Sequence, residues 1–369
     1  MKTKDTTAIV ASTRLYTLDY LRGFAACGIM LFHYLNNGVG STTGANTFLM
    51  RIGSYGVSIF YVLSGLTLYY VYFRRMKPSL PDLKDFYVKR FFRIFPLLWL
   101  VVILTLLIKH YNPGWKQLVL NFTGLFSFIH RPGLALGQWS IGNELVFYLF
   151  FPFFVLFSKK SKFVFYLFSA AIIAIYLYFA FRVLTPNIDL VHQWTTYINP
   201  LNQVFLFLGG YLIGFLFREV KISKTTDLLI LAVGLLLLIF YPTGNGNEAV
   251  LVTGINRLVF TGICFIICFA FYKNTVKLPR ILNRFFTFLG EASYSVYLLH
   301  PIVWGLVGLI ALPAAAHIII SIPLTFFVSY IVYNKYERYF MEKGRVIAKK
   351  YINPPKETTV QQTKEATAV

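Results

Sequence analysis

Long apolar segments dominate the chain and alternate with short polar connections. A helix needs about 20 apolar residues, with a range of roughly 17 to 25, to cross the hydrocarbon core of a bilayer. On that criterion the sequence predicts ten membrane-spanning helices, of which the seventh is short: 18–36, 48–73, 91–109, 138–158, 162–182, 198–217, 227–241, 250–272, 287–310 and 315–337. The predicted fold class is therefore an all-α, polytopic integral membrane protein.

Basic residues occur after every second segment and are nearly missing from the connections between. The loops 37–47, 183–197 and 242–249 contain almost no lysine or arginine, and the basic connections follow the second, fourth, sixth, eighth and tenth segments. Because lysine and arginine accumulate on the cytoplasmic side of membrane proteins, this alternation predicts that both termini are cytoplasmic. We divide the chain into a cytoplasmic segment 1–15, a transmembrane domain 16–340 and a cytoplasmic, disordered tail 341–369.

Composition supports a membrane protein and argues against a soluble domain and a nucleic-acid-binding protein. The 369 residues are 57% hydrophobic and 13% charged, whereas soluble domains carry about 25% charged residues. The net charge of +21 does not indicate nucleic-acid binding, because the basic residues are distributed over the loops of one side. Cys27, Cys264 and Cys268 lie in apolar runs without metal-ligand spacing, so neither a disulfide framework nor a metal site is expected.

The N-terminus resembles the start of a signal peptide, but Asp19 and Arg22 interrupt the apolar run, so we expect a retained first helix.

The first apolar segment carries ionisable residues, which are costly in a bilayer and usually functional there. Arg22 and His33 are eleven residues apart, so they share one helix face at a separation of roughly 16 Å along the axis. His33 suits a general base or proton carrier, because the imidazole pKa lies near neutrality, or it forms an interhelical hydrogen bond. Asp19 and Arg22 have the i, i+3 spacing of a structural ion pair.

A basic cluster opens the third predicted span. Lys89, Arg90 and Arg93 share one helix face in KRFFRIFPLLW, and Pro96 is expected to limit the local helix. One interpretation is a solvated cluster on the cytoplasmic side. The other is a phosphate-binding site, because guanidinium groups bind phosphate oxygens with two parallel hydrogen bonds.

Two further segments carry polar groups inside apolar sequence. In QWSIGNELVFYLFFP, Glu144 and Tyr148 share a helix face, and we expect Glu144 near the outer surface, where it faces solvent or orients His33. In GEASYSVYLLHP, His300 either packs through a hydrogen bond or lines a substrate path. The small residues of GVSIFYVLSGL, Gly56, Ser58, Ser64 and Gly65, favour close helix packing.

Together these motifs resemble the membrane O-acyltransferases of acyltransferase family 3. The resemblance rests on Arg22 with ten residues before His33, then GVSIFYVLSG, KRFFRIFP, WSIGNELVFY and SYSVYLLHP, in the family's order over 16–336. It departs from the family in FYVLSGL and in Asn143 before Glu144, where many members have two acids.

The resemblance implies a ten-span enzyme of the bacterial cytoplasmic membrane. Such an enzyme transfers an acyl group, most often acetyl, from cytoplasmic acyl-coenzyme A to a hydroxyl of a carbohydrate or lipid-linked glycan on the far side. It implies that His33 is the catalytic histidine, with Glu144 as its acidic partner, and that Arg22, Arg90 and Arg93 bind the coenzyme. We further expect Asp19, Ser140, Tyr148 and His300 to contact a substrate or to support the site. The residues leave open direct transfer or an acyl-histidine intermediate. The alternative class is a transporter or flippase of an acylated or lipid-linked glycan.

Overall fold

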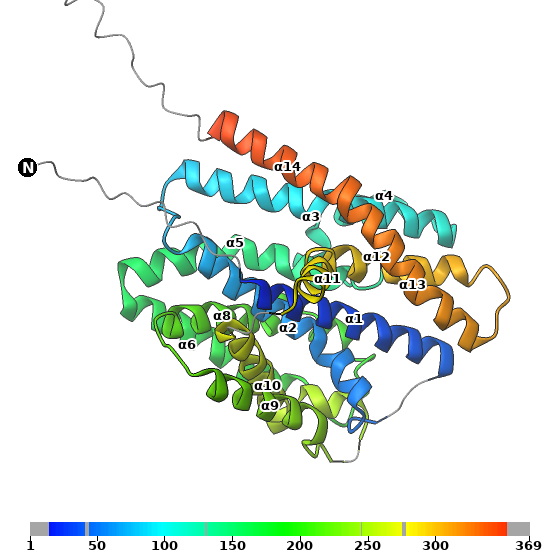
Figure 1. The fold of residues 1–369 in the computed structure, drawn as a ribbon, viewed down its shortest axis with the longest axis horizontal. Helices are drawn as coiled ribbons and strands as arrows, with labels where there is room; N and C mark the ends of the chain where they lie inside the picture. Colours follow the sequence, from blue (N-terminus) through cyan, green and yellow to red (C-terminus); the bar gives the residue numbers. More distant parts are fainter. Residues whose placement is uncertain (1–14, 41–43, 130, 245, 275–277, 353–369) are drawn as a thin grey trace, which may run out of the picture.

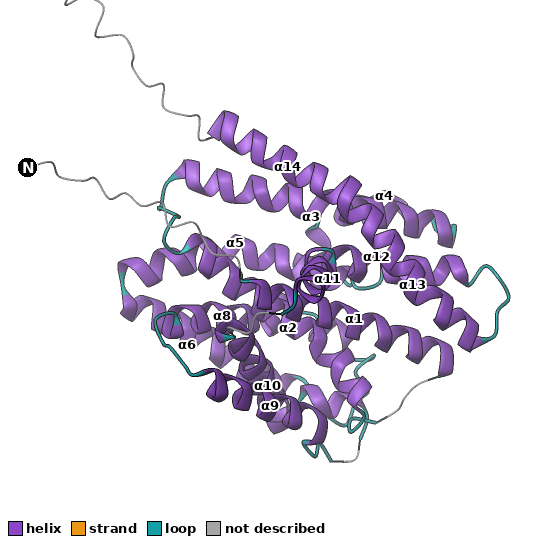
Figure 2. Cartoon of the chain, viewed as in Figure 1, coloured by secondary structure: helices purple, strands orange, loops and turns teal. Residues whose placement is uncertain are grey.

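The computed structural model describes residues 15–40, 44–129, 131–244, 246–274 and 278–352. This part of the chain is helical, with loops and turns between the helices and no strand (Figures 1 and 2). The elements are α1 Tyr16–Val39, α2 Phe48–Tyr72, α3 Leu80–Lys109, α4 Gly114–Thr123, η1 Leu125–Ile129, α5 Gln138–Lys160, α6 Lys162–Tyr178, η2 Phe179–Val183, α7 Trp194–Tyr197, α8 Pro200–Phe217, α9 Lys224–Phe240, η3 Glu248–Val252, α10 Gly254–Lys273, α11 Arg280–Glu291, α12 Ser293–Val307, α13 Ala314–Val332, η4 Tyr333–Glu337, α14 Arg338–Ile347 and η5 Ala348–Ile352.

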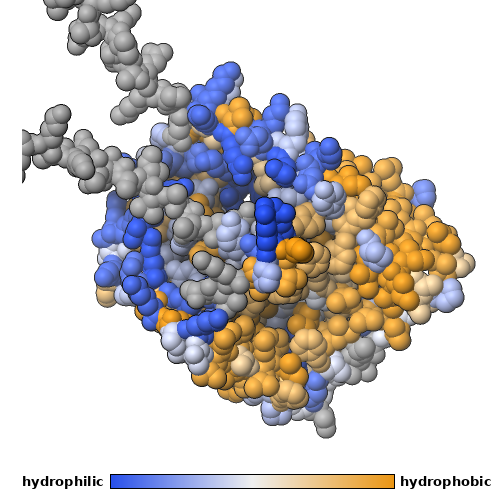
Figure 3. All heavy atoms as spheres, viewed as in Figure 1, coloured by the Kyte–Doolittle hydropathy of each residue, from blue (hydrophilic) through white to orange (hydrophobic). Residues whose placement is uncertain are grey.

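Seven helical stretches among the described residues are long and apolar enough to cross a membrane. They are Phe48–Tyr72, Leu80–Lys109, Gln138–Lys160, Lys162–Val183, Trp194–Phe217, Gly254–Lys273 and Ala314–Ile352. The other three predicted spans correspond to α1, which contains Asp19 and Arg22, to α9 with 17 residues, and to α12 with 15 residues. Apolar atoms cover much of the surface, including that of α13 (Figure 3). The chain is a multi-pass membrane protein.

Glycines let the central helices touch through their backbones. A Cβ atom on Gly65 of α2 would lie 1.9 Å from the carbonyl oxygen of Phe207 on α8, and one on Gly210 would lie 1.9 Å from that of Val62. Small residues allow this approach because nothing projects between the two helix axes. The packing interpretation of Gly65 is confirmed, and it fixes α2 against α8.

The ninth predicted span, 287–310, is not one helix. It consists of α11 and α12, which are separated at Ala292. Gly290 packs on α1 so closely that a Cβ atom there would lie 2.1 Å from the carbonyl oxygen of Asp19. This contact brings the break between α11 and α12 beside the charged end of α1.

The structure corrects two expectations, one in the C-terminal region and one in α3. First, α13 continues through η4 into α14 and η5, so residues 341–352 of the predicted tail are helical, and 353–369 lie outside the described residues. α14 packs along α3 (Figure 1), and a Cβ atom on Gly344 would lie 2.7 Å from the Phe92 Cβ atom. This contact holds the segment in place. Second, Pro96 lies inside α3, which extends on both sides of it, so the proline does not limit the helix.

Candidate active site

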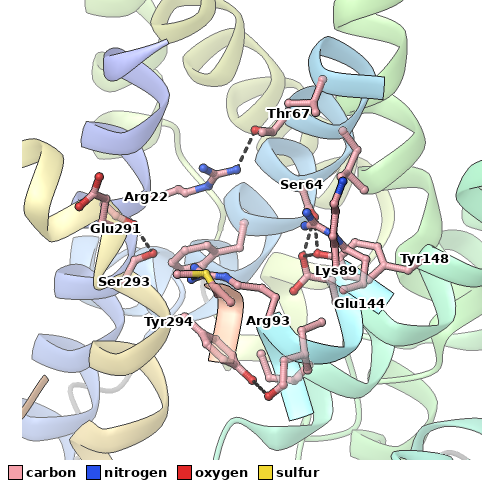
Figure 4. A pocket seen from close by; sticks show the side chains of 18 of the residues that line it. Arg22, Ser64, Thr67, Lys89, Arg93, Glu144, Tyr148, Glu291, Ser293 and Tyr294 are labelled. Atoms are coloured by element: carbon pink, nitrogen blue, oxygen red, sulfur yellow. Dashed lines mark hydrogen bonds between the residues drawn. The ribbon is translucent and has the colours of Figure 1, made fainter. Parts of the chain in front are cut away.

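A cavity of about 710 Å³ lies among α1, α2, α3, α5 and the junction of α11 with α12. We call it the arginine cavity, because its lining includes Arg22, Arg75, Arg90, Arg93 and Arg345. Figure 4 shows side chains from several of these helices pointing toward one another around it. Such a concentration of cations suits an anionic ligand.

Arg22 reaches from α1 across to α2. Its Nη2 atom donates to Thr67 Oγ1 at 2.7 Å, and its Nη1 atom lies 3.3 Å from Asp19 Oδ1 (Figure 4 shows the Thr67 bond). The expected structural ion pair with Asp19 is therefore present. Thr67 is a partner that the sequence analysis missed, because no local spacing relates the two residues.

Arg90 is held by aromatic rings. Its guanidinium carbon lies 5.7 Å from the centre of the Tyr148 ring and 6.0 Å from that of Phe86. Its buried Nε atom has no hydrogen-bond partner, and Arg90 forms no ion pair with any carboxylate of the described residues. Arg90 thus combines an aromatic support with a positive charge that no acid neutralises.

Arg93, one turn further along α3, is neutralised by an acid from the far end of the chain. Its Nη1 atom lies 3.1 Å from Glu337 Oε2, and the Glu337 side chain is only 1% exposed. Ser295 donates a hydrogen bond to the other Glu337 oxygen. The third cation of the predicted cluster, Lys89, pairs with Asp85 at 2.7 Å. Glu337 was missed by the sequence analysis, which assigned it to the end of an apolar span.

Glu144 lies in the arginine cavity and not beside His33. Its carboxylate accepts hydrogen bonds from Ser64 and from Tyr148 (Figure 4). Tyr148 is thus the partner expected from the helix spacing, whereas Ser64 was interpreted only as a packing residue.

A second cavity of about 380 Å³ contains His33. We call it the histidine cavity, and its lining also includes Phe32, Trp139, Trp194, Tyr197, Lys109 and Glu248. The His33 ring stacks on His300 with centroids 5.3 Å apart and contacts Phe32 edge-on at 5.1 Å. The imidazole of His33 makes no hydrogen bond to any described residue, so its ring nitrogens are available to a ligand in this cavity.

The separation of Glu144 from His33 follows from the helix register. On α2, Gly53, Ser54 and Val57 line the histidine cavity, whereas Glu144 bonds Ser64, which is seven residues beyond Val57 and so about 10 Å further along the axis. The structure thus places Glu144 with Ser64 and does not bring it together with His33 in one cavity. The position of α5 explains this. Its first turn already lines both cavities, with Trp139 in the histidine cavity and Ser140 in the arginine cavity, so Glu144 lies one turn further into the arginine cavity.

The two cavities are adjacent. Val57 and Tyr297 line both of them. The Tyr297 hydroxyl lies 2.8 Å from Ser140 Oγ and donates to the Gly137 carbonyl oxygen at 3.2 Å. Ser140 thus positions the tyrosine at the boundary, a role that the sequence did not indicate.

His300 supports His33 from behind and lines neither cavity. It is buried, its Nδ1 atom lies 3.2 Å from the Val296 carbonyl oxygen, and its Nε2 atom has no hydrogen-bond partner among the described residues. Its own carbonyl accepts a hydrogen bond of 2.8 Å from Tyr34. Of the two interpretations of His300, the geometry favours packing, here against the His33 ring.

Glu248 is a polar group of the histidine cavity that sequence analysis missed. It begins η3, in a loop that we interpreted only as lacking basic residues. Burial raises the pKa of its carboxyl above the ordinary value, and nearby Asp189 raises that pKa further. The Glu248 carboxylate makes no hydrogen bond or ion pair with any described residue, so it is open to the cavity that it lines. The available sequence signal was a lone acid in the otherwise uncharged loop 242–249.

Comparison with known proteins identifies the family. The family model described as an acyltransferase domain, that of acyltransferase family 3, matches residues 15–334. The chain belongs to this family, and its class is that of multi-pass membrane acyltransferases.

Individual relatives are distant. A provisionally named acetyltransferase, ORF330, of Acidianus two-tailed virus is 25% identical over 302 residues, which is 79% of this chain and 84% of the viral protein. A provisionally named O-acetyltransferase of Staphylococcus aureus strain COL is 25% identical over 81% of this chain and 52% of its own length. The O-acetyltransferase OatA of strain NCTC 8325 is 24% identical over 78% of this chain and 50% of its own. The chain thus spans about half the length of these staphylococcal relatives. No solved structure matches it significantly.

Proposed function

We propose that the protein is a membrane-embedded O-acyltransferase that moves an acetyl group from cytoplasmic acetyl-coenzyme A to a hydroxyl of a carbohydrate or lipid-linked glycan across the membrane. The observation that carries this proposal is the adjacency of the two cavities. One is lined by arginines and the other contains His33, and they meet at Val57 and Tyr297. Membership of the acyltransferase family and the names of the O-acetyltransferase relatives support the reaction class.

The arginine cavity would hold the donor. Guanidinium groups bind phosphate oxygens well, and coenzyme A carries phosphates at the end far from its thioester. Arg90 would contribute most of the three arginines expected to bind it, because no acid neutralises it, and Arg22 would assist from α1. Arg93 would contribute less, since Glu337 already compensates its charge. Glu144 would act indirectly by holding Tyr148 under Arg90.

His33 would act as general base in the neighbouring cavity. It would take the proton of the acceptor hydroxyl as that oxygen forms a bond to the thioester carbonyl carbon. The tetrahedral intermediate would then collapse with cleavage of the C–S bond, and the thiolate would take the proton back from the imidazolium. His300 would hold the His33 ring in place by stacking.

This function requires a fixed orientation in the bacterial cytoplasmic membrane. We propose ten spans with both termini in the cytoplasm, the arginine cavity open toward the cytoplasm and the histidine cavity toward the outside. Hydrophilic atoms gather over α14 and the first part of α3, which border the arginine cavity (Figure 3). Several basic residues lie in these segments, as the preference of cytoplasmic surfaces for lysine and arginine requires. Membrane lipid would surround the apolar faces.

The experiment is acetyl transfer by the purified protein in liposomes. With labelled acetyl-coenzyme A and a glycan acceptor, the native chain should release coenzyme A and label the glycan. His33→Ala should lower the rate by 10² to 10⁴-fold, the usual contribution of a general base, without changing the yield of folded protein. His192→Ala, an exposed histidine of the loop before α7, is the matched control and should leave the rate unchanged. A rate for His33→Ala close to that of the native chain would refute the assignment.

A further inference from the structure

The histidine cavity has the composition of a small-molecule site. Its volume of about 380 Å³ lies within the range of roughly 300 to 1,000 Å³ found for such sites, which combine aromatic walls with a few polar groups. Three of its wall residues form one aromatic cluster. Trp139 and Trp194 have ring centroids 5.4 Å apart, and Tyr197 lies 5.5 Å from Trp194 and 6.0 Å from Trp139.

This aromatic cluster also has hydrogen-bond donors that can bind a ligand. Neither the Trp139 nor the Trp194 indole N–H donates to a described residue, so both donors are available to a ligand. Both rings are half-buried, so they present a partly accessible apolar surface. A pyranose matches this combination, because its C–H faces are apolar and its hydroxyls need donors and acceptors at the edge.

The charged residues in and near the histidine cavity restrict the charge of its ligand. Glu248 offers a half-buried carboxylate that pairs with no side chain of the described residues, and Asp189, hydrogen-bonded to Asn247, lies close enough to it to raise its pKa. A carboxylate accepts hydrogen bonds from two sugar hydroxyls but repels a second anion. The cation of this lining, Lys109, is exposed at the end of α3, where solvent screens its charge.

We infer that Trp139, Trp194 and Glu248 form a binding site for an uncharged pyranose, which places one of its hydroxyls at His33. This inference rests on the proposed function, and it specifies where the acceptor binds and what charge it has. The ring packs on the tryptophans, and Glu248 accepts hydrogen bonds from its hydroxyls. An anionic sugar, such as a uronic acid, is disfavoured.

The test measures sugar binding without any donor. Full-length protein in detergent is titrated by calorimetry with methyl β-glucopyranoside, methyl N-acetyl-β-glucosaminide and methyl β-glucuronide. At least one uncharged pyranoside should bind about tenfold or more tightly than the glucuronide. Trp194→Ala and Glu248→Gln should each weaken its binding about tenfold, as loss of ring contact or of a charged hydrogen bond would. Glu248→Gln should also reduce the discrimination against the glucuronide.

Matched controls lie outside the cavity. Trp115→Ala removes an exposed tryptophan of α4, and Glu219→Gln neutralises a carboxylate that is 83% exposed; both should bind like the native chain. If Trp194→Ala does not fold, the isosteric Glu248→Gln decides the matter. Equal binding of glucuronide and uncharged sugars, or native affinity in the cavity variants, would overturn the inference.

The same measurements separate this inference from the proposed reaction. If the binding pattern holds but acetyl transfer is absent, the site stands and the reaction is wrong. If transfer occurs and the KM for the glycan is unchanged in both cavity variants, the reaction stands and the site is wrong.

Discussion

Arg90 and Arg93 occupy equivalent positions on successive turns of α3, yet their surroundings differ. Arg90 lies over the rings of Phe86 and Tyr148 and pairs with no acid in the described part of the chain, whereas Arg93 pairs with the buried Glu337. Removing one member of a buried ion pair leaves an uncompensated charge, which costs about 3 to 5 kcal/mol. The first arginine is therefore suited to ligand binding and the second to stability.

Substituting Arg90 and Arg93 separately should distinguish ligand binding from a contribution to stability. Arg90→Ala should raise the KM for acetyl-coenzyme A by about 10 to 100-fold, the value of a charged hydrogen bond, with little change in thermal stability. Arg93→Ala should lower the melting temperature instead. The double variant Arg93→Ala/Glu337→Gln should recover part of that loss, because the remaining group is neutral. Unchanged KM in Arg90→Ala would argue against a donor site in the arginine cavity.

At the scale of elements, backbone contacts at glycines decide how close the helices come. Gly65 and Gly210 join α2 to α8, and Gly290 joins α11 to α1 beside Arg22. The α2 contact matters for the site, because the same helix carries Ser64, Thr67 and Val57 to the two cavities. The packing of α2 against α8 thus also sets where its cavity-lining residues lie.

Gly65→Ala should destabilise the protein, because its new Cβ atom would lie 1.9 Å from the Phe207 carbonyl oxygen and the helices must separate. Overpacking typically costs 1 to 3 kcal/mol or more. Gly262→Ala in α10 is the control, since a Cβ atom there meets nothing within 4 Å. Thermal unfolding of the two variants in detergent compares them. Equal melting temperatures would show that the α2–α8 contact is not tight.

At the scale of the whole molecule, the two cavities differ in their charged lining, because, among the described residues, five arginines line the arginine cavity and none lines the histidine cavity. The arginine cavity borders α14 and the hydrophilic surface of Figure 3, and the histidine cavity is formed with the loops near α7 and η3. Charged donor and glycan acceptor would then enter from opposite sides and meet at Tyr297. The proposed mechanism depends on this arrangement across the bilayer.

Cysteine labelling in intact cells tests the orientation. In a background with Cys27, Cys264 and Cys268 replaced by alanine, Lys84→Cys and Lys343→Cys should be shielded from a membrane-impermeant thiol reagent. His192→Cys and Tyr111→Cys should react, because their loops lie on the opposite side in the proposed topology. All four residues are exposed, so accessibility reports sidedness and not burial. The reverse labelling pattern would contradict the proposed direction of transfer.

The amino-acid sequence by itself determined the helical class, the positions of most helices and the local pairs. Apolar length and i, i+3 or i, i+4 spacing are properties of one segment, so the Asp19–Arg22 ion pair and the Glu144–Tyr148 hydrogen bond were predictable. The helix break at Ala292 and the helical segment 341–352 were not predicted. Both features pack against helices distant in sequence, α1 and α3, and the local pattern of residues does not show such contacts.

Only the tertiary structure decided which groups share a cavity. Glu337 neutralises Arg93, Thr67 holds Arg22, and Glu248 faces the cavity of His33, although each pair is distant in sequence. Glu144 was expected beside His33 and lies with Ser64 instead, because the depth of one helix relative to another depends on interhelical packing. Periodicity gives the face of a helix on which a residue lies, but the packed helices set its depth and its neighbours.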